Sequence, residues 1–250
     1  MKNNTKKIVG YTGPSKFTPE IISMIEDSNC VPIYLGQNKH EDLDYLYNLC
    51  DGIVLGGGSD WSPISRGEEI TNGESFSKFD LKRDLRELYL IEKIVKEKKP
   101  TLAICRGFQG LGLFLGLPFI NDINGSKIVH SPSSAGIELE DFSPCHFVKC
   151  RDNFKSEFWD REYVNSFHHQ AVEYNSKFNY ENCSIEVIAT AQTDFGSVRG
   201  NTVYSPSKIV EVMRVIDSPI LGVQFHPEAD YTINKASLII VDKFIKSLNE

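Results

Sequence analysis

Short apolar runs alternate with longer amphipathic segments along the first half of the chain, and this alternation constrains the fold more than any other feature. Apolar residues at helical spacing follow each run, with charged residues between them. Alternating strands and helices are typical of a parallel sheet covered by crossover helices, so the pattern predicts an α/β fold. The expected strands are residues 8–11, 31–35 and 52–55, and the expected helices are residues 19–28, 42–49 and 79–99.

The second half contains more strands, joined by shorter connections that are typical of hairpins, and it ends in an amphipathic helix. The chain of 250 residues shows no internal repeat, no low-complexity linker and no break in composition. We therefore expect one domain spanning residues 1–250. The expected strands of this half are residues 119–123, 147–150, 186–190, 209–215 and 220–225, and the expected helix is residues 233–248.

Cys105 stands where an apolar strand must turn sharply into a helix, within residues 101–110. Gly107, two positions later, permits a tight turn, as in a nucleophile elbow. A helix N-terminus favours the thiolate form of a cysteine over the thiol. We therefore expect an exposed, nucleophilic thiol at the end of a sheet. The alternative is a cysteine that serves as a small buried hydrophobic residue.

A second apolar run, residues 220–225, ends directly in His226, Pro227 and Glu228. Residues two apart on an extended chain point to the same side, and Pro227 favours an extended chain here. We therefore expect Glu228 to accept a hydrogen bond from His226, which leaves the other ring nitrogen to take the proton of Cys105. The alternative for this segment is an ordinary loop.

Three glycines, Gly56 to Gly58, follow the expected strand at residues 52–55. A nucleotide site is a weak interpretation because neither of the usual phosphate-binding glycine motifs follows. A flexible backbone at this strand end could donate an N–H to a developing oxyanion, together with the N–H of Arg106. A tight turn with no catalytic role is equally compatible with the glycines.

Charge and cysteine content exclude several classes of function. The formal net charge of −7 and the pI near 5.5 argue against nucleic acid or an anionic membrane as a partner. No apolar stretch approaches the length of a membrane span or of a signal peptide, so we expect a cytoplasmic protein. The six cysteines form no Cys-x-x-Cys pair, which makes a zinc site or a disulfide framework improbable.

Several segments, taken in order, resemble the class I glutamine amidotransferases, and among them the γ-glutamyl-γ-aminobutyrate hydrolases of the peptidase C26 family. Arg66 and Leu117 are differences, since that branch usually has Tyr and Gly at these positions. The similar segments run along most of the chain: Gly56-Gly-Gly-Ser-Asp60 with Pro63 and Gly67-Glu-Glu69, Arg83-Asp84 with Glu87, Ile104-Cys-Arg-Gly-Phe-Gln109, Asn121-Asp-Ile123, Val164-Asn-Ser-Phe-His-His-Gln170 and Gly222-Val-Gln-Phe-His-Pro-Glu228.

The resemblance implies a flavodoxin-like three-layer sandwich, with a mostly parallel central sheet and a small antiparallel extension. It makes Cys105 the nucleophile, His226 the general acid and base, and Glu228 the residue that orients His226. It requires no metal and no cofactor. Because adjacent histidines in a strand point to opposite faces, we expect at most one of the two in this chain to face substrate. The oxyanion hole would use the backbone of Gly57 or Gly58 and of Arg106, and the γ-glutamyl pocket would be lined by Gln109, Phe167, His168 and His169.

The reaction implied by the resemblance is hydrolysis of the γ-glutamyl amide bond of a small γ-glutamyl-amine conjugate, through a γ-glutamyl thioester. Two other enzymatic roles stay open: a glutaminase subunit that delivers ammonia to a separate synthase, and a hydrolase of a larger γ-glutamyl nucleotide or sugar amide. A third alternative is a binding protein without activity, but such a protein has no need of Cys105, His226 and Glu228 together. The sequence does not fix the oligomeric state, and a homodimer stays open.

Overall fold

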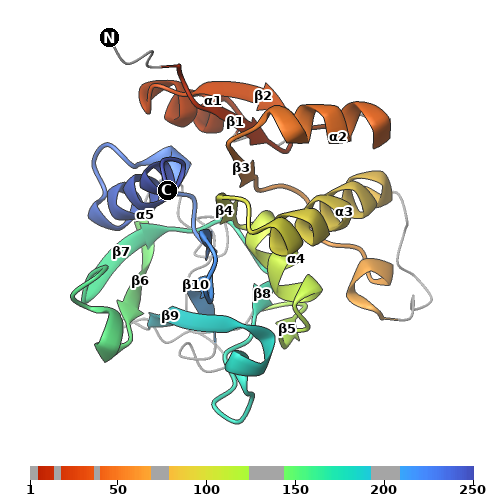
Figure 1. Ribbon diagram of the computed structural model, residues 1–250. Helices are drawn as coiled ribbons and strands as arrows, with labels where there is room; N and C mark the ends of the chain where they lie inside the picture. The colour runs from red at the N-terminus through yellow and green to blue at the C-terminus, as the bar shows by residue number, and fades with distance from the viewer. Residues whose placement is uncertain (1–4, 14–17, 37–39, 69–78, 124–143, 193–208) are drawn as a thin grey trace.

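The computed structural model describes residues 5–13, 18–36, 40–68, 79–123, 144–192 and 209–250. Its centre is a nine-stranded sheet in the order β2-β1-β3-β4-β11-β10-β9-β6-β7 (Figure 1). The first five strands of this order are parallel, as the alternation of strands and helices in the sequence predicts. They are β1 (Ile8–Tyr11), β2 (Val31–Tyr34), β3 (Gly52–Leu55), β4 (Thr101–Ile104) and β11 (Ile220–Val223).

The sheet continues beyond β11 with antiparallel strands, which confirms the predicted antiparallel extension. Two strands pair separately as a small second sheet. The sequence patterns miss β7 and β8, because β7 carries charged residues in place of an apolar run and β8 has only two residues. The strands of the extension are β6 (Pro144–Cys150), β7 (Arg161–Asn165), β9 (Ile185–Gln192) and β10 (Val210–Val215), and those of the second sheet are β5 (Phe119–Ile120) and β8 (Ala171–Val172).

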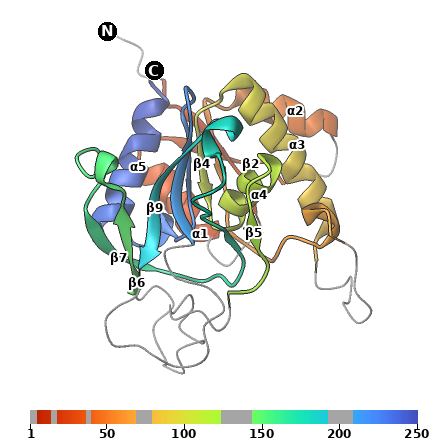
Figure 2. The same cartoon turned by 90° about the horizontal axis from the view of Figure 1, so that it is seen from below.

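Helices cover both faces of the sheet and make the molecule a sandwich of three layers (Figure 2). On one face, α1 (Thr18–Asp27) and α5 (Lys235–Ser247) bury their apolar sides in a core with Val9, Val54 and Leu102. On the other face, a second core joins three helices to the sheet. These helices are α2 (His40–Leu49), α3 (Leu81–Glu97) and α4 (Arg106–Phe114).

Two helices begin two residues later than the sequence pattern predicts, because a polar side chain caps each one. Asp80 accepts a hydrogen bond from the backbone N–H of Arg83, so α3 begins at Leu81. Asn234 accepts from the N–H groups of Ala236 and Ser237 and starts α5. Short 3₁₀ turns complete the described elements at Ile64–Arg66, Asp152–Phe154, Tyr180–Cys183 and Pro227–Ala229.

The carboxyl ends of β3, β4 and β11 meet at one edge of the sheet, because the three strands are adjacent and parallel. Gly56 follows β3 and Cys105 follows β4, while His226 lies three residues beyond the end of β11. Topology therefore places the three sequence segments singled out above at a common site. Among the described residues, no helix is both long enough and apolar enough to cross a membrane.

Candidate active site

Cys105 occupies a strained turn between β4 and α4. Its φ of 49° and ψ of −102° are unusual for a residue other than glycine. The N–H of Cys105 donates to the carbonyl of Val223 at 2.8 Å, which ties the turn to β11. A Cβ on Gly107 would lie 2.3 Å from the carbonyl oxygen of Leu55, so only glycine fits there. The predicted sharp turn from strand to helix is therefore present.

The expectation of an exposed thiol is wrong for the described residues, since Cys105 is only 4% exposed. Its side chain belongs to the core cluster that contains Ile104, Val223 and Phe225. Gly57 also lies close, because a Cβ on that glycine would be 3.7 Å from the Cβ of Cys105. The bend thus places the thiol beneath the glycine loop that follows β3.

His226 lies between a carboxylate and the thiol. Its Nδ1 donates to Oε1 of Glu228 at 2.7 Å, and Cys105 lies close enough to the ring to raise its pKa. Both His226 and Glu228 are buried. The ring of Phe167 meets the imidazole edge-on, with centroids 5.9 Å apart and an interplanar angle of 75°. Thiol, imidazole and carboxylate are therefore buried together, with the imidazole between the other two groups.

The environment of His226 changes the stability of its proton. Burial lowers the pKa of His226, but the charges of Glu228 and Cys105 and the hydrogen bond to Glu228 outweigh burial and raise the pKa to about 10. A carboxylate on one side of the ring and a sulfur on the other thus favour imidazolium. An imidazole in this setting can take a proton from the thiol and hold it.

The contact between His226 and Glu228 has a different origin from the one expected. The chain is not extended here: Pro227–Ala229 is a 3₁₀ turn, and His226 precedes it with φ −107° and ψ 86°. The turn, rather than alternation along a strand, brings the carboxylate to the ring. Proline at the first position of this turn supplies the φ angle that the turn requires.

The glycine loop after β3 runs between His226 and a buried arginine. A Cβ on Gly57 would lie 2.7 Å from Cε1 of His226, so the backbone passes directly beside the imidazole. Gly58 has a φ of 153°, and a Cβ there would lie 2.1 Å from Nη1 of Arg83. Nη2 of Arg83 donates to the carbonyl of Gly57 at 2.7 Å and to that of Gly56 at 3.4 Å.

Below this loop lies a buried ionic network made by α3 and the first residue of α4. Arg83 and Arg106 both donate to Glu87, and Arg106 also donates to Asp84. All four side chains are at most 2% exposed. Burial lowers the pKa of Arg106 to about 9. This value is still above neutral pH, so the guanidinium stays protonated. Opposite charges of equal number thus offset the cost of burying each group.

The residues expected to line a γ-glutamyl pocket occupy different environments. Phe167 lies against His226, as described above. Nε2 of Gln109 donates to the carbonyl of Gln170 at 2.8 Å and to Oε1 of Gln224 at 3.3 Å, and the Gln109 side chain is buried. Gln109 also follows the turn closely, since its N–H donates to the carbonyl of Cys105 at 2.9 Å. It therefore links α4 to the segments that carry Gln170 and Gln224.

The two adjacent histidines do not lie in a strand, contrary to the premise of the sequence argument, but between β7 and β8. His168 is buried, its Nδ1 donates to the carbonyl of Gln170 at 2.9 Å, and burial lowers its pKa to about 3. His169 is half-exposed and bonded to Oδ2 of Asp60 at 2.7 Å, a contact that raises its pKa. The two rings therefore differ in environment even without a strand.

Sequence patterns gave no role to Asn165, to Arg83 or to Glu87, although all three lie in the segments that carry the resemblance. Asn165 bonds the backbone of His226, and Arg83 bonds the glycine loop. The one signal for these three residues in the sequence is a polar side chain within an otherwise apolar or helical segment. That signal does not show which residue each side chain contacts. Glu69, part of one segment that carries the resemblance, lies outside the described residues.

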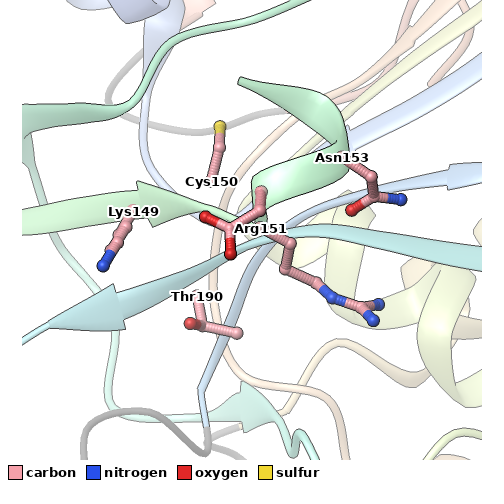
Figure 3. A pocket seen from close by; sticks show the side chains of 6 residues that line it. Lys149, Cys150, Arg151, Asn153 and Thr190 are labelled. Carbon is pink, nitrogen blue, oxygen red and sulfur yellow. The ribbon is translucent and has the colours of Figure 1, made fainter. Parts of the chain in front are cut away.

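A separate pocket opens on the antiparallel extension, where β6 ends beside β9 (Figure 3). None of the residues singled out from the sequence lines it. Burial raises the pKa of Cys150 to about 11, so this thiol is a poor nucleophile at neutral pH. The pocket is lined by Lys149, Cys150, Arg151, Asp152, Asn153 and Thr190.

Comparison with known proteins assigns this arrangement to a fold and to a family. A glutamine amidotransferase of Thermotoga maritima superposes with a TM-score of 0.55 at 20% identity, covering 90% of this chain and 77% of that one. The fold is that of the class I glutamine amidotransferases. The model of the peptidase C26 family matches residues 2–228, so the chain belongs to this family.

Curated relatives agree with this assignment. The chain is 29% identical to YvdE of Lactococcus lactis, a protein described as glutamine amidotransferase-like, over 89% of this chain and 83% of the relative. It is 28% identical to the γ-glutamyl-γ-aminobutyrate hydrolase PuuD of Escherichia coli, over 81% of this chain and 74% of the relative. Family and relatives together support a hydrolase that acts on amide bonds.

Proposed function

We propose that the protein is a cysteine-dependent hydrolase that cleaves the γ-glutamyl amide bond of a small γ-glutamyl-amine conjugate, releasing glutamate and the amine. The observation that carries the proposal is the buried group of Cys105, His226 and Glu228 beside the glycine loop, in which Glu228 is hydrogen-bonded to His226 and Cys105 acts on the same ring. A conjugate of the γ-glutamyl-γ-aminobutyrate type is the expected substrate, because a relative at 28% identity is named for that activity.

The first half of the reaction forms a thioester. Cys105 gives its proton to His226 and its sulfur attacks the γ-carbonyl carbon of the substrate. Negative charge develops on the carbonyl oxygen, where the N–H of Arg106 and the N–H of Gly57 or Gly58 stabilise it. The C–N bond then breaks, His226 returns the proton to the departing amine, and the γ-glutamyl group stays on the sulfur.

The second half removes the γ-glutamyl group. His226 takes a proton from a water molecule, whose oxygen attacks the thioester carbonyl. The C–S bond breaks, glutamate leaves and the sulfur recovers its proton from His226. Glu228 keeps the ring in one tautomer and stabilises its charge during both halves.

Glutamate release from a panel of γ-glutamyl amides tests the proposal directly. Wild-type protein is expected to release glutamate, and Cys105→Ala and His226→Ala are expected to be inactive while keeping the wild-type circular dichroism spectrum. A γ-glutamyl adduct on Cys105, trapped by acid quench and found by mass spectrometry, would establish the thioester. Turnover that survives Cys105→Ala would refute the mechanism.

A second role, as a glutaminase that supplies ammonia, is favoured by the relative described as glutamine amidotransferase-like. Such a protein uses the same three side chains but acts on free glutamine. Comparing kcat/KM for glutamine with kcat/KM for γ-glutamyl amides of larger amines separates the two roles. A preference for glutamine would replace the proposed substrate and leave the proposed chemistry in place.

A further inference from the structure

One buried carboxylate on α3 connects the two segments that would form the oxyanion hole. Oε1 of Glu87 accepts from Nε of Arg83 at 2.7 Å, and its Oε2 accepts from Nη1 of Arg106. Arg83 contacts the glycine loop after β3, and Arg106 is the residue that directly follows Cys105. Glu87 therefore contacts Arg106 directly and contacts the glycine loop through Arg83.

Arg83 sets the direction in which the loop peptides point. Its Nη2 donates to the carbonyls of Gly56 and Gly57, at 3.4 and 2.7 Å. In a trans peptide the N–H points away from the preceding carbonyl, so the N–H groups of Gly57 and Gly58 are directed away from Arg83. His226 and Cys105 pack against Gly57, whereas Arg83 packs against Gly58.

Arg106 is fixed on its other sides as well. Its guanidinium lies over the ring of Trp61, 4.1 Å from the centroid, and also donates to Asp84. Nε1 of Trp61 donates to the backbone carbonyl of Arg106 at 2.8 Å. Side chain and backbone of this residue are thus held together, and its N–H, in the first turn of α4, has a fixed direction.

Fixed direction is what an oxyanion hole requires, because N–H dipoles stabilise developing charge only when they need no reorganisation. Three consecutive glycines have little conformational preference of their own. A buried guanidinium that grips two of their carbonyls removes that freedom. The network therefore does more than neutralise buried charge: it holds the loop at the thiol.

Resting on the proposed hydrolase function, we propose that Glu87 is a positioning residue that couples the glycine loop to the nucleophile turn, through Arg83 on one side and Arg106 on the other. Its loss lets the loop peptides rotate relative to Cys105. The consequence is selective: steps that build an oxyanion become slow, while the thiol keeps its position and its reactivity.

The informative variants are Glu87→Gln, which keeps the shape of the side chain, and Arg83→Lys, which keeps the charge but has no separate nitrogens to contact Glu87 and the loop carbonyls at the same time. Lys82→Ala is the matched control, since Lys82 is exposed on the same helix. Two rates are measured for each protein. One is kcat for hydrolysis of γ-glutamyl-p-nitroanilide, and the other is alkylation of Cys105 by iodoacetamide, which displaces iodide without forming an oxyanion.

Both variants are expected to lose about 10- to 100-fold in kcat, a part of the roughly 10²- to 10³-fold effect of an oxyanion donor. KM and the alkylation rate are expected to stay within about twofold of wild type. Undiminished kcat overturns the inference. A parallel fall of kcat and alkylation, including one caused by unfolding, also overturns it, because the network would then be structural only.

Failure of the proposed function gives a different result. Wild-type protein that releases no p-nitroaniline refutes the proposed hydrolase, and this inference with it. Wild-type turnover with a fully active Glu87→Gln variant refutes the inference alone. The Lys82→Ala control is expected to match wild type in both rates, which separates an effect of the network from an effect of substitutions in α3.

Discussion

The side chain of Asn165 is hydrogen-bonded to both the backbone N–H and the backbone carbonyl of His226. Its Nδ2 donates to the carbonyl of His226 at 2.8 Å, and its Oδ1 accepts from the N–H of His226 at 2.9 Å. The same Nδ2 donates to Asp230 at 3.2 Å. Because Asn165 ends β7, at the edge of the sheet, this pair ties an edge strand to the segment that follows the central strand β11.

Asn165→Ala is expected to reduce both activity and stability. It leaves the N–H and carbonyl of a buried histidine without these partners, which costs about 1–3 kcal/mol. A displaced imidazole also meets the thiol poorly, so kcat should fall at least about tenfold. Urea denaturation and glutamate release check the two effects. Asn153→Ala, at an exposed position, is the control, and wild-type kcat in Asn165→Ala would show that these hydrogen bonds have no catalytic value.

Gly57→Ala is expected to abolish activity while leaving the fold intact. The added Cβ would lie 2.7 Å from Cε1 of His226, so the ring or the loop must move. A loss of roughly 100-fold or more in kcat is expected, since either movement disturbs the hole or the base. Ser59→Ala, exposed in the same loop, should behave as wild type. Near-normal activity of the Gly57 variant would place the reacting groups elsewhere.

Glu228→Gln is expected to lower kcat/KM by roughly 10²- to 10⁴-fold and to change its pH dependence. His226 has a pKa raised to about 10, and only its protonated form can protonate the departing amine. Wild-type activity should therefore fall as pH rises through this value. Without the carboxylate the pKa drops, and the alkaline limb moves to lower pH. A pH–rate profile whose alkaline limb stays in place would contradict the assignment of Glu228, and Glu92→Gln is the surface control.

His168 is expected to make the protein less stable as pH falls. Its pKa is about 3 in the folded chain, against 6.5 for the free side chain. Below pH 6.5 the unfolded chain therefore binds a proton that the folded chain excludes, and stability falls by about 1.4 kcal/mol per pH unit. Between pH 7 and 5, urea denaturation of wild type should show about 2 kcal/mol more loss than that of His168→Gln.

His169 supplies the contrast, because Asp60 raises its pKa. A raised pKa gives stability that is present at low pH and disappears as pH rises through the folded value. His169→Gln should therefore lose stability relative to wild type at pH 5 and little at pH 8. The same sign of effect in both histidine variants would show that their environments do not differ as described.

The parts of the fold that the sequence predicts are those where one segment determines its own structure. β3, β4 and β11 lie within apolar runs, and the turn at Cys105 follows from an apolar run, a cysteine and a glycine two residues later. The strands β7 and β8 were missed because their residues show no apolar run, and only pairing with other strands defines them.

The site divides in the same way. Cys105, His226 and Glu228 can be picked out from strand ends and side-chain chemistry, although the contact between His226 and Glu228 comes from a turn and not from an extended chain. Arg83 and Asn165 could not be given partners, because each partner lies far away in the sequence. Gly57 is 26 residues from Arg83, and His226 is 61 residues from Asn165.

β4 and β11 are neighbours in the middle of the nine-stranded sheet, with three strands beyond one and four beyond the other. Strands in such a place open only when the whole domain unfolds, so their amide protons should exchange with solvent most slowly. Local opening of the outer strands therefore leaves the sulfur of Cys105 and the imidazole of His226 at the same distance from each other. Outer strands and surface loops can be rebuilt for another substrate without loosening the pair that does the chemistry.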